Sequence, residues 1–193
     1  TEEDDMKRSV LSALLLCLLL SGCAKNTVRL AYPEEAPSVP SAAAPRICVV
    51  RLAQAWGGDP SVGVREDGSQ FMPDSDVQDW LTHSLAVALT RQGLNAGTSY
   101  SESAARAAGC TTILTGEIQQ VRLTEHSMTS YESSMRVVLN LDTPKGRIWK
   151  NSFSSGVTRT VVPLSSAPDG VLTENMKDIT DSMARAVKEK LYP

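Results

Sequence analysis

The stretch Met135-Arg136-Val137-Val138-Leu139-Asn140-Leu141 and the loop Asp142-Thr143-Pro144-Lys145-Gly146 after it indicate the fold class more clearly than any other part of the sequence. In this stretch, apolar side chains alternate with Arg136 and Asn140, which is typical of a strand that buries one face. The loop has the residue types of a turn between strands, so residues 148–157 are expected to form the returning strand. An antiparallel pair of strands is therefore predicted here.

Further strands are predicted before this pair. Residues 112–123 are expected to form one long strand. Its apolar side chains change face between Ile118 and Val121, so a bulge is expected near Gln119 and Gln120. Residues 46–52 are apolar and rich in β-branched side chains, which favours a first strand. Residues 61–66 and 94–98 are weaker candidates for short strands.

Two long helices are predicted from apolar side chains that recur at three- and four-residue steps. The first covers residues 76–92, with Ser75 and Gln78 as a capping box and Gly93 at its end. The second covers residues 171–191, and a short helix is expected over residues 101–109. Together these elements predict an α+β fold, a mostly antiparallel sheet of about four to six strands with the two long helices and the short one packed on one face.

The beginning of the chain has a different character. Met6, Lys7 and Arg8 precede an apolar run over residues 10–20, and Ser21-Gly22-Cys23 follows directly. The apolar run is too short to cross the roughly 30 Å core of a bilayer as a helix. This arrangement closely resembles the signal of bacterial lipoproteins, with Leu20-Ser21-Gly22-Cys23 as the lipobox. The resemblance implies cleavage between Gly22 and Cys23, with lipid attached to Cys23.

The chain therefore divides into three expected parts. Residues 1–22 are upstream residues and the signal peptide, residues 23–45 are the lipidated cysteine and a tether rich in proline, alanine and serine, and residues 46–193 are a single α+β periplasmic domain. The residue after the cysteine is Ala24 and not the aspartate associated with inner-membrane retention in enteric bacteria, which implies the outer membrane. The expected location is the periplasmic side of the outer membrane, with the lipid as the membrane anchor.

Two cysteines remain for the folded domain, because Cys17 lies in the signal and Cys23 carries lipid. These are Cys48 and Cys110. In an oxidising periplasm they can pair in a disulfide, and two buried thiols without a bond are the alternative. The sequence leaves both open. No histidine or further cysteine lies near them at metal-ligand spacing, so no metal site is expected.

The composition argues against several classes of function. The net charge is −3 and the basic residues are scattered singly, so a nucleic-acid partner is not expected. The two histidines, His83 and His126, are expected on the solvent side of the first long helix and in a turn between strands. The sequence has no nucleophile elbow and no phosphate-binding glycine loop. We therefore expect no catalytic residues, no cofactor and no enzyme activity.

Three features together carry a resemblance to a family. They are the lipobox with its proline-rich continuation, the helix end Leu89-Thr90-Arg91-Gln92-Gly93-Leu94, and the segment Ile113-Leu114-Thr115-Gly116-Glu117-Ile118. They resemble small periplasm-facing lipoproteins of the YajG-like type and, more loosely, accessory lipoproteins of envelope transport systems. The resemblance implies a non-catalytic outer-membrane lipoprotein that acts as a structural or protein-interaction module, with other envelope proteins as partners. An accessory lipoprotein of a lipid or solute transport system is the alternative.

Overall fold

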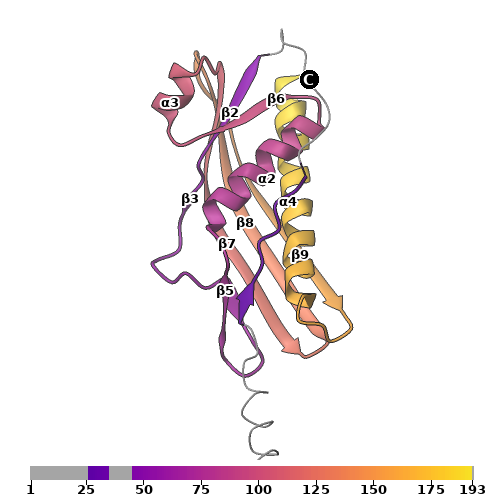
Figure 1. The fold of residues 1–193 in the computed structure, drawn as a ribbon. Coiled ribbons are helices and arrows are strands. Elements are labelled where there is room, and N and C mark those ends of the chain that lie inside the picture. The colour runs from indigo at the N-terminus through magenta and orange to yellow at the C-terminus, as the bar shows by residue number, and fades with distance from the viewer. Residues whose placement is uncertain (1–25, 35–44, 193) are drawn as a thin grey trace, which may run out of the picture.

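Strand β7 (Thr112–Ser127) is the axis of the sheet, because it is paired along both of its edges. A computed structural model of the chain describes residues 26–34 and 45–192 (Figure 1). Along one edge, β7 pairs antiparallel with β8 (Ser130–Thr143). Along the other edge it pairs in parallel with three short strands in succession: β2 (Arg46–Val50), β3 (Ala53–Gln54) and β4 (Gly63–Val64).

The remaining strands extend the sheet from these neighbours. β9 (Gly146–Thr160) pairs antiparallel with β8, and β6 (Asn95–Ser99) pairs in parallel with β2. β5 (Gln70–Pro73) pairs antiparallel with β4, and β1 (Thr27–Val28) pairs in parallel with β5. The described residues thus form a mixed sheet of nine strands.

The expected α+β class is confirmed, but the expectation of a mostly antiparallel sheet of about four to six strands is wrong. Alternating apolar residues identify a strand without giving the direction of its neighbour. Here the chain returns through helices to the same end of the sheet, so β2, β6 and β7 run in parallel. Strands β1, β3 and β4 have two residues each, too few to show an alternating pattern.

Helices α2 (Val77–Arg91) and α4 (Ala167–Leu191) lie over one face of the sheet (Figure 1). Their apolar stripes and the inner face of the sheet form the main core. Its fully buried members include Trp80, Leu85, Leu89, Leu114, Ile118, Leu139, Met183 and Val187. The apolar spacing that predicted the two long helices therefore corresponds to the surface that each helix buries.

The short helix α3 (Glu102–Ala107) packs on the opposite face of the sheet. Successive side chains of a strand point to opposite faces. In β2, Ile47 belongs to the main core, whereas Cys48 and Val50 form a second, small cluster with Ala105 of α3. The expectation that all three helices share one face is therefore wrong for α3. This helix has six residues and buries only Ala105, so its sequence has no apolar stripe that could indicate which face of the sheet it covers.

The N-terminus of α2 differs by one residue from the expectation. Its N-cap is Asp76, whose side chain accepts a hydrogen bond of 2.9 Å from the backbone N–H of Asp79. The predicted capping box of Ser75 and Gln78 is wrong, because the extended backbone of Asp76 lets its carboxylate reach the third residue of the helix. At the other end, Gly93 has a φ of 84°, as expected for a glycine that ends a helix.

Several details of the long strands were correctly predicted. The pairing of β7 with β8 shifts register between Ile118 and Gln120, which confirms the bulge. The hairpin between Thr143 and Gly146 is also confirmed. However, β7 continues to Ser127, so His126 lies within this strand and the expected position in a turn is wrong.

The folded domain also begins earlier than the sequence indicated. Residues 26–34, expected to be part of the tether over residues 23–45, pack on the domain, and Val28 and Leu30 are buried. The Leu30 N–H donates to Asp74 Oδ1 (2.9 Å), and the Trp80 indole N–H donates to the carbonyl of Ala31 (3.0 Å). The signal peptide, Gly22 and Cys23 lie outside the described residues.

One glycine permits the close approach of β4 to β7. A Cβ atom on Gly63 would collide with the main chain of Leu123, whereas a Cβ atom on Gly97 in β6 would meet nothing. We expect Gly63→Ala to lower the free energy of unfolding by about 1–3 kcal/mol, and Gly97→Ala to leave it unchanged or raise it. Urea denaturation of both variants measures this. Equal stability of the two would contradict the close approach.

Candidate functional site

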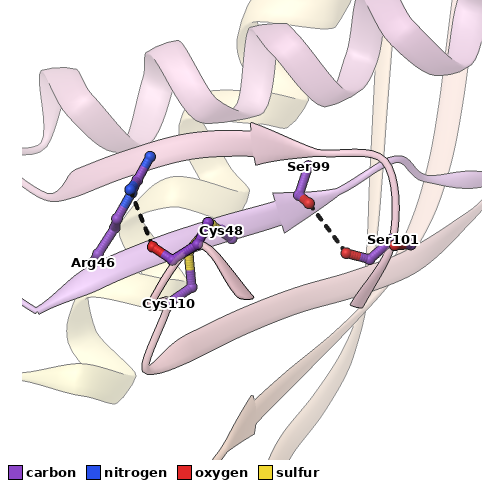
Figure 2. Close-up of a disulfide and its surroundings, with 6 residues drawn as sticks. Arg46, Cys48, Ser99, Ser101 and Cys110 are labelled. Carbon is purple, nitrogen blue, oxygen red and sulfur yellow. Dashed lines mark hydrogen bonds between the residues drawn. A yellow bond between two sulfur atoms is a disulfide. The ribbon is translucent and has the colours of Figure 1, made fainter. Parts of the chain in front are cut away.

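Cys48 and Cys110 form a disulfide that joins β2 to the segment between α3 and β7 (Figure 2). Their Cα atoms are 5.8 Å apart and both side chains are buried. The end of α3 positions Cys110, because Gly109 has a φ of 78° and the Cys110 N–H donates to the carbonyl of Ala105. This is the hydrogen-bonding pattern of a helix terminated by glycine.

A second contact holds the same two segments together. The Arg46 guanidinium donates to the carbonyl of Ala108 (3.2 Å) (Figure 2). The Thr111 N–H donates to the carbonyl of Arg46 (3.2 Å). Because both cysteines are buried, the bridge is shielded from attack by an external thiolate. We interpret the disulfide as a structural link between α3 and the sheet.

The disulfide is expected to contribute a large part of the stability of the domain. It joins residues 62 positions apart, and the loss of loop entropy in the unfolded chain corresponds to about 4 kcal/mol. We expect the double variant Cys48→Ala/Cys110→Ala to lose about this amount in urea denaturation, and the original chain to lose a similar amount in reducing agent. Unchanged stability under reduction would contradict a bridge in the folded protein.

A buried carboxylate, Glu125, connects the N-terminal segment to the far end of β7. The Arg65 guanidinium donates to Glu125 Oε2 (2.8 Å), and the Tyr131 hydroxyl donates to Glu125 Oε1 (2.8 Å). The Glu125 side chain is only 4% exposed. Arg65 also donates to the side-chain oxygen of Asn26 (3.1 Å), and the Met72 N–H donates to the Asn26 carbonyl (2.8 Å). Asn26 is thereby fixed at this end of the sheet.

The ionisation of this group follows from its partners. Burial disfavours the charged form of Glu125, but the hydrogen bonds from Arg65 and Tyr131 and the charge of Arg65 outweigh it, so the pKa of Glu125 lies below its usual value. Burial and the hydrogen bond to Glu125 raise the pKa of Tyr131 to about 12. At neutral pH, Glu125 is therefore an anion and Tyr131 a neutral donor. Neither group has the intermediate pKa that suits proton transfer at neutral pH.

This network makes the stability of the domain depend on pH. Because the pKa of Glu125 is lowered on folding, its stabilising effect is present above the unfolded-state value near 4.5 and is lost as the pH falls below it. We expect Glu125→Gln to lower the free energy of unfolding by about 1.5–3 kcal/mol at pH 7, and by less at pH 3.5, which lies below the unfolded-state pKa. Urea denaturation at the two pH values measures the difference.

The matched control is Glu132→Gln. Glu132 accepts from His126 (3.0 Å), and both side chains are half exposed, so its loss should change the stability by less than about 1 kcal/mol at pH 7. An equal effect of Glu125→Gln at both pH values would contradict the role assigned to the Glu125 carboxylate.

The two histidines lie on different elements and do not form one site. His83 is on α2 and is partly buried, so the expectation of a solvated side chain is wrong. Its ring packs edge-on against the ring of Tyr32, with the centroids 5.5 Å apart. His126 is on β7 and contacts Glu132. Among the contacts of the described residues, none joins either histidine to a serine or cysteine. No group of three metal-binding side chains occurs in residues 26–34 and 45–192.

A shallow cleft lies beside His83, where the N-terminal segment, α2 and β6 meet. Its volume is about 250 Å³, and it is lined in part by Tyr32, His83, Arg51 and Tyr100. Arg51 is already satisfied, because it donates to Asp79 (2.6 Å) and to Asp76 (2.9 Å). The volume of the cleft is below the roughly 300–1,000 Å³ typical of small-molecule sites. Its cation, Arg51, is paired with two aspartates.

Sequence reasoning missed the Glu125 network. Glu125, Arg65 and Asn26 are far apart in the sequence and are joined only by the pairing of β4, β5 and β7. The one signal in the sequence was the glutamate at position 125, within a stretch whose apolar and polar residues otherwise alternate as in a strand.

Among the helices of residues 26–34 and 45–192, none has the length and apolar character needed to cross a membrane.

The comparisons with known proteins concern the fold. No protein-family model matches the chain, and the search of curated proteins found no relative. A crystal structure of XCC0632 from Xanthomonas campestris, described under the family DUF330, aligns with a TM-score of 0.60 at 11% identity over 85% of this chain and 95% of that one. The described domain shares its fold with XCC0632.

Two further structures are similar. An uncharacterised protein aligns with a TM-score of 0.51 at 14% identity, over 83% of this chain and 97% of that chain. Lipoprotein GNA1162 from Neisseria meningitidis aligns with a TM-score of 0.39 at 13% identity, over 73% of this chain and 99% of that chain. At such low identities, XCC0632 and the uncharacterised protein show the fold alone, so membership of the YajG-like family stays a prediction.

Proposed function

We propose that this chain is a non-catalytic lipoprotein of the bacterial envelope, held at the periplasmic side of the outer membrane by lipid on Cys23. In this role the domain acts as a structural or protein-interaction module. The observation that carries the proposal is the position of Asn26, which is fixed to the domain only three residues after the cysteine of the lipobox.

The short distance along the chain has a mechanical consequence. Three residues span at most about 11 Å when fully extended. The domain is therefore held directly at the membrane surface and not at the end of a long tether. The buried Glu125–Arg65 pair resists displacement of Asn26 from the sheet, so a force on the lipid is transmitted to the end of β7.

The charged side chains of the described residues support a non-catalytic role. Glu125 and Tyr131 stabilise each other in fixed protonation states, and Arg51 is paired with two aspartates. The disulfide between Cys48 and Cys110 supports a periplasmic location, because such bonds persist in oxidising compartments.

The alternative from the sequence is an accessory lipoprotein of a lipid or solute transport system. Direct binding of an apolar cargo would need a cavity between the helices and the sheet. Buried side chains such as Trp80, Leu85 and Met183 occupy this layer in the described part of the chain. The filled core favours an interaction module over a carrier.

The anchor can be tested by substituting its cysteine. We expect Cys23→Ala, expressed as the full chain in bacteria, to incorporate no radiolabelled palmitate and to leave the membrane fraction for the soluble periplasm. Cys17→Ala, a cysteine of the same apolar segment, is the matched control and should be labelled and membrane-bound like the unaltered chain. Palmitate labelling of Cys23→Ala at the original level would overturn the proposal.

A further inference from the structure

The end of the domain that carries Asn26 also carries three exposed apolar side chains. Val162 is 72% exposed, Met128 is 66% exposed and Leu164 is 63% exposed. We refer to Met128, Val162 and Leu164 as the apolar rim. Large apolar side chains that gather in one exposed place indicate a contact surface for a protein or a membrane.

A backbone hydrogen bond joins the two loops that carry the apolar rim. Met128 lies in the turn between β7 and β8, and the next residue, Thr129, accepts a hydrogen bond from the Val161 N–H (2.8 Å). Val162 and Leu164 follow in the loop between β9 and α4. Val162 and Leu164, with Val161 and Val171, line a shallow hollow of about 490 Å³.

The apolar rim and the N-terminal attachment lie at the same end of the molecule. Arg65 contacts both Asn26 and Glu125, and Glu125 lies three residues before Met128. Figure 1 shows the start of β1, the turn between β7 and β8, and the start of α4 together at the lower end of the fold. The chain therefore leaves the domain at the end where the apolar side chains are exposed.

We infer that the apolar rim rests in the lipid leaflet that holds the acyl chains on Cys23. This inference rests on the proposed function and adds the orientation of the domain. Only two residues separate Cys23 from Asn26, and the three steps along the chain reach at most about 11 Å, so the end of the domain that carries Asn26 must face the leaflet whenever the lipid is inserted. A lipid surface is the one partner that this constraint brings to the apolar rim.

The charges at this end are compatible with a lipid contact. Arg65 is paired with Glu125, and Arg159 is paired with Glu174. Arg29 is exposed at the same end, and its backbone N–H donates to Asp169 of α4 (3.0 Å). Two exposed acids, Glu66 and Asp67, lie on the turn between β4 and β5. The proposed contact is made by the apolar side chains of the apolar rim, so it should depend little on salt concentration.

The orientation places the rest of the domain away from the membrane. β7 ends here at Ser127; its 16 residues, at about 3.3 Å per residue, make the strand roughly 50 Å long. The hairpin between β8 and β9, with the partly exposed Ile148 close to it, lies at the opposite end. The buried disulfide lies at this distal end too, and so does α3, whose side chains other than Ala105 are exposed to periplasmic partners.

The chain is suited to a depth measurement by spin labelling. In the lipidated protein Cys23 carries lipid and Cys48 is bonded to Cys110, so a new cysteine is the one free thiol in the mature chain. We would label Leu164→Cys and, as the matched control, Ile148→Cys, which is apolar, 41% exposed and at the opposite end. Met128→Cys gives a second reading at the apolar rim if Leu164→Cys folds poorly.

The labelled proteins are reconstituted in vesicles of phosphatidylethanolamine and phosphatidylglycerol. Labels at Leu164 and Met128 should have a ratio of oxygen to nickel-chelate accessibility several-fold higher than the label at Ile148, and added salt should not change it. Mass analysis of the same samples reports the acylation of Cys23. Equal ratios at both ends of an acylated protein would overturn the lipid contact and leave the proposed function standing, whereas an unacylated chain that does not bind vesicles would overturn both.

Discussion

Backbone hydrogen bonds along both edges of β7 (Thr112–Ser127) hold the parts of the domain together, and the other features depend on them. β8 follows one edge over nearly the whole length of β7, and β2, β3 and β4 follow the other edge in succession. Each buried N–H and C=O in this layer needs a partner, so the segment from residue 46 to residue 64 is drawn out alongside β7. Glycine at position 63 permits the closest approach.

The same pairing separates two faces with different roles. One face of β7 and β8 packs against α2 and α4 and forms the main core. The other face is covered at its distal end by α3, where Cys48 and Cys110 are bonded. The disulfide adds a covalent link at the end of the sheet where only the six-residue helix α3 packs on this face.

At the opposite end, the pairing gathers Asn26, Arg65, Glu125 and Tyr131 into one hydrogen-bonded group. Glu125 is ionised although it is buried, because Arg65 and Tyr131 satisfy its oxygens. This group fixes the point where the folded chain begins. In the function proposed here it connects a lipid anchor to the strand that organises the whole domain, without any catalytic step.

The sequence by itself determined the α+β class, both long helices, the bulge after Ile118 and the hairpin at Thr143–Gly146, because each depends on the periodicity of neighbouring residues. It also supplied the lipobox and a pair of cysteines in the folded domain. Only the tertiary structure decided the parallel direction of β2 and β6, the placement of α3, the attachment of residues 26–34 and the Glu125 network. These features join segments distant in the chain, and no local pattern specifies which distant backbone or side chain a residue will meet.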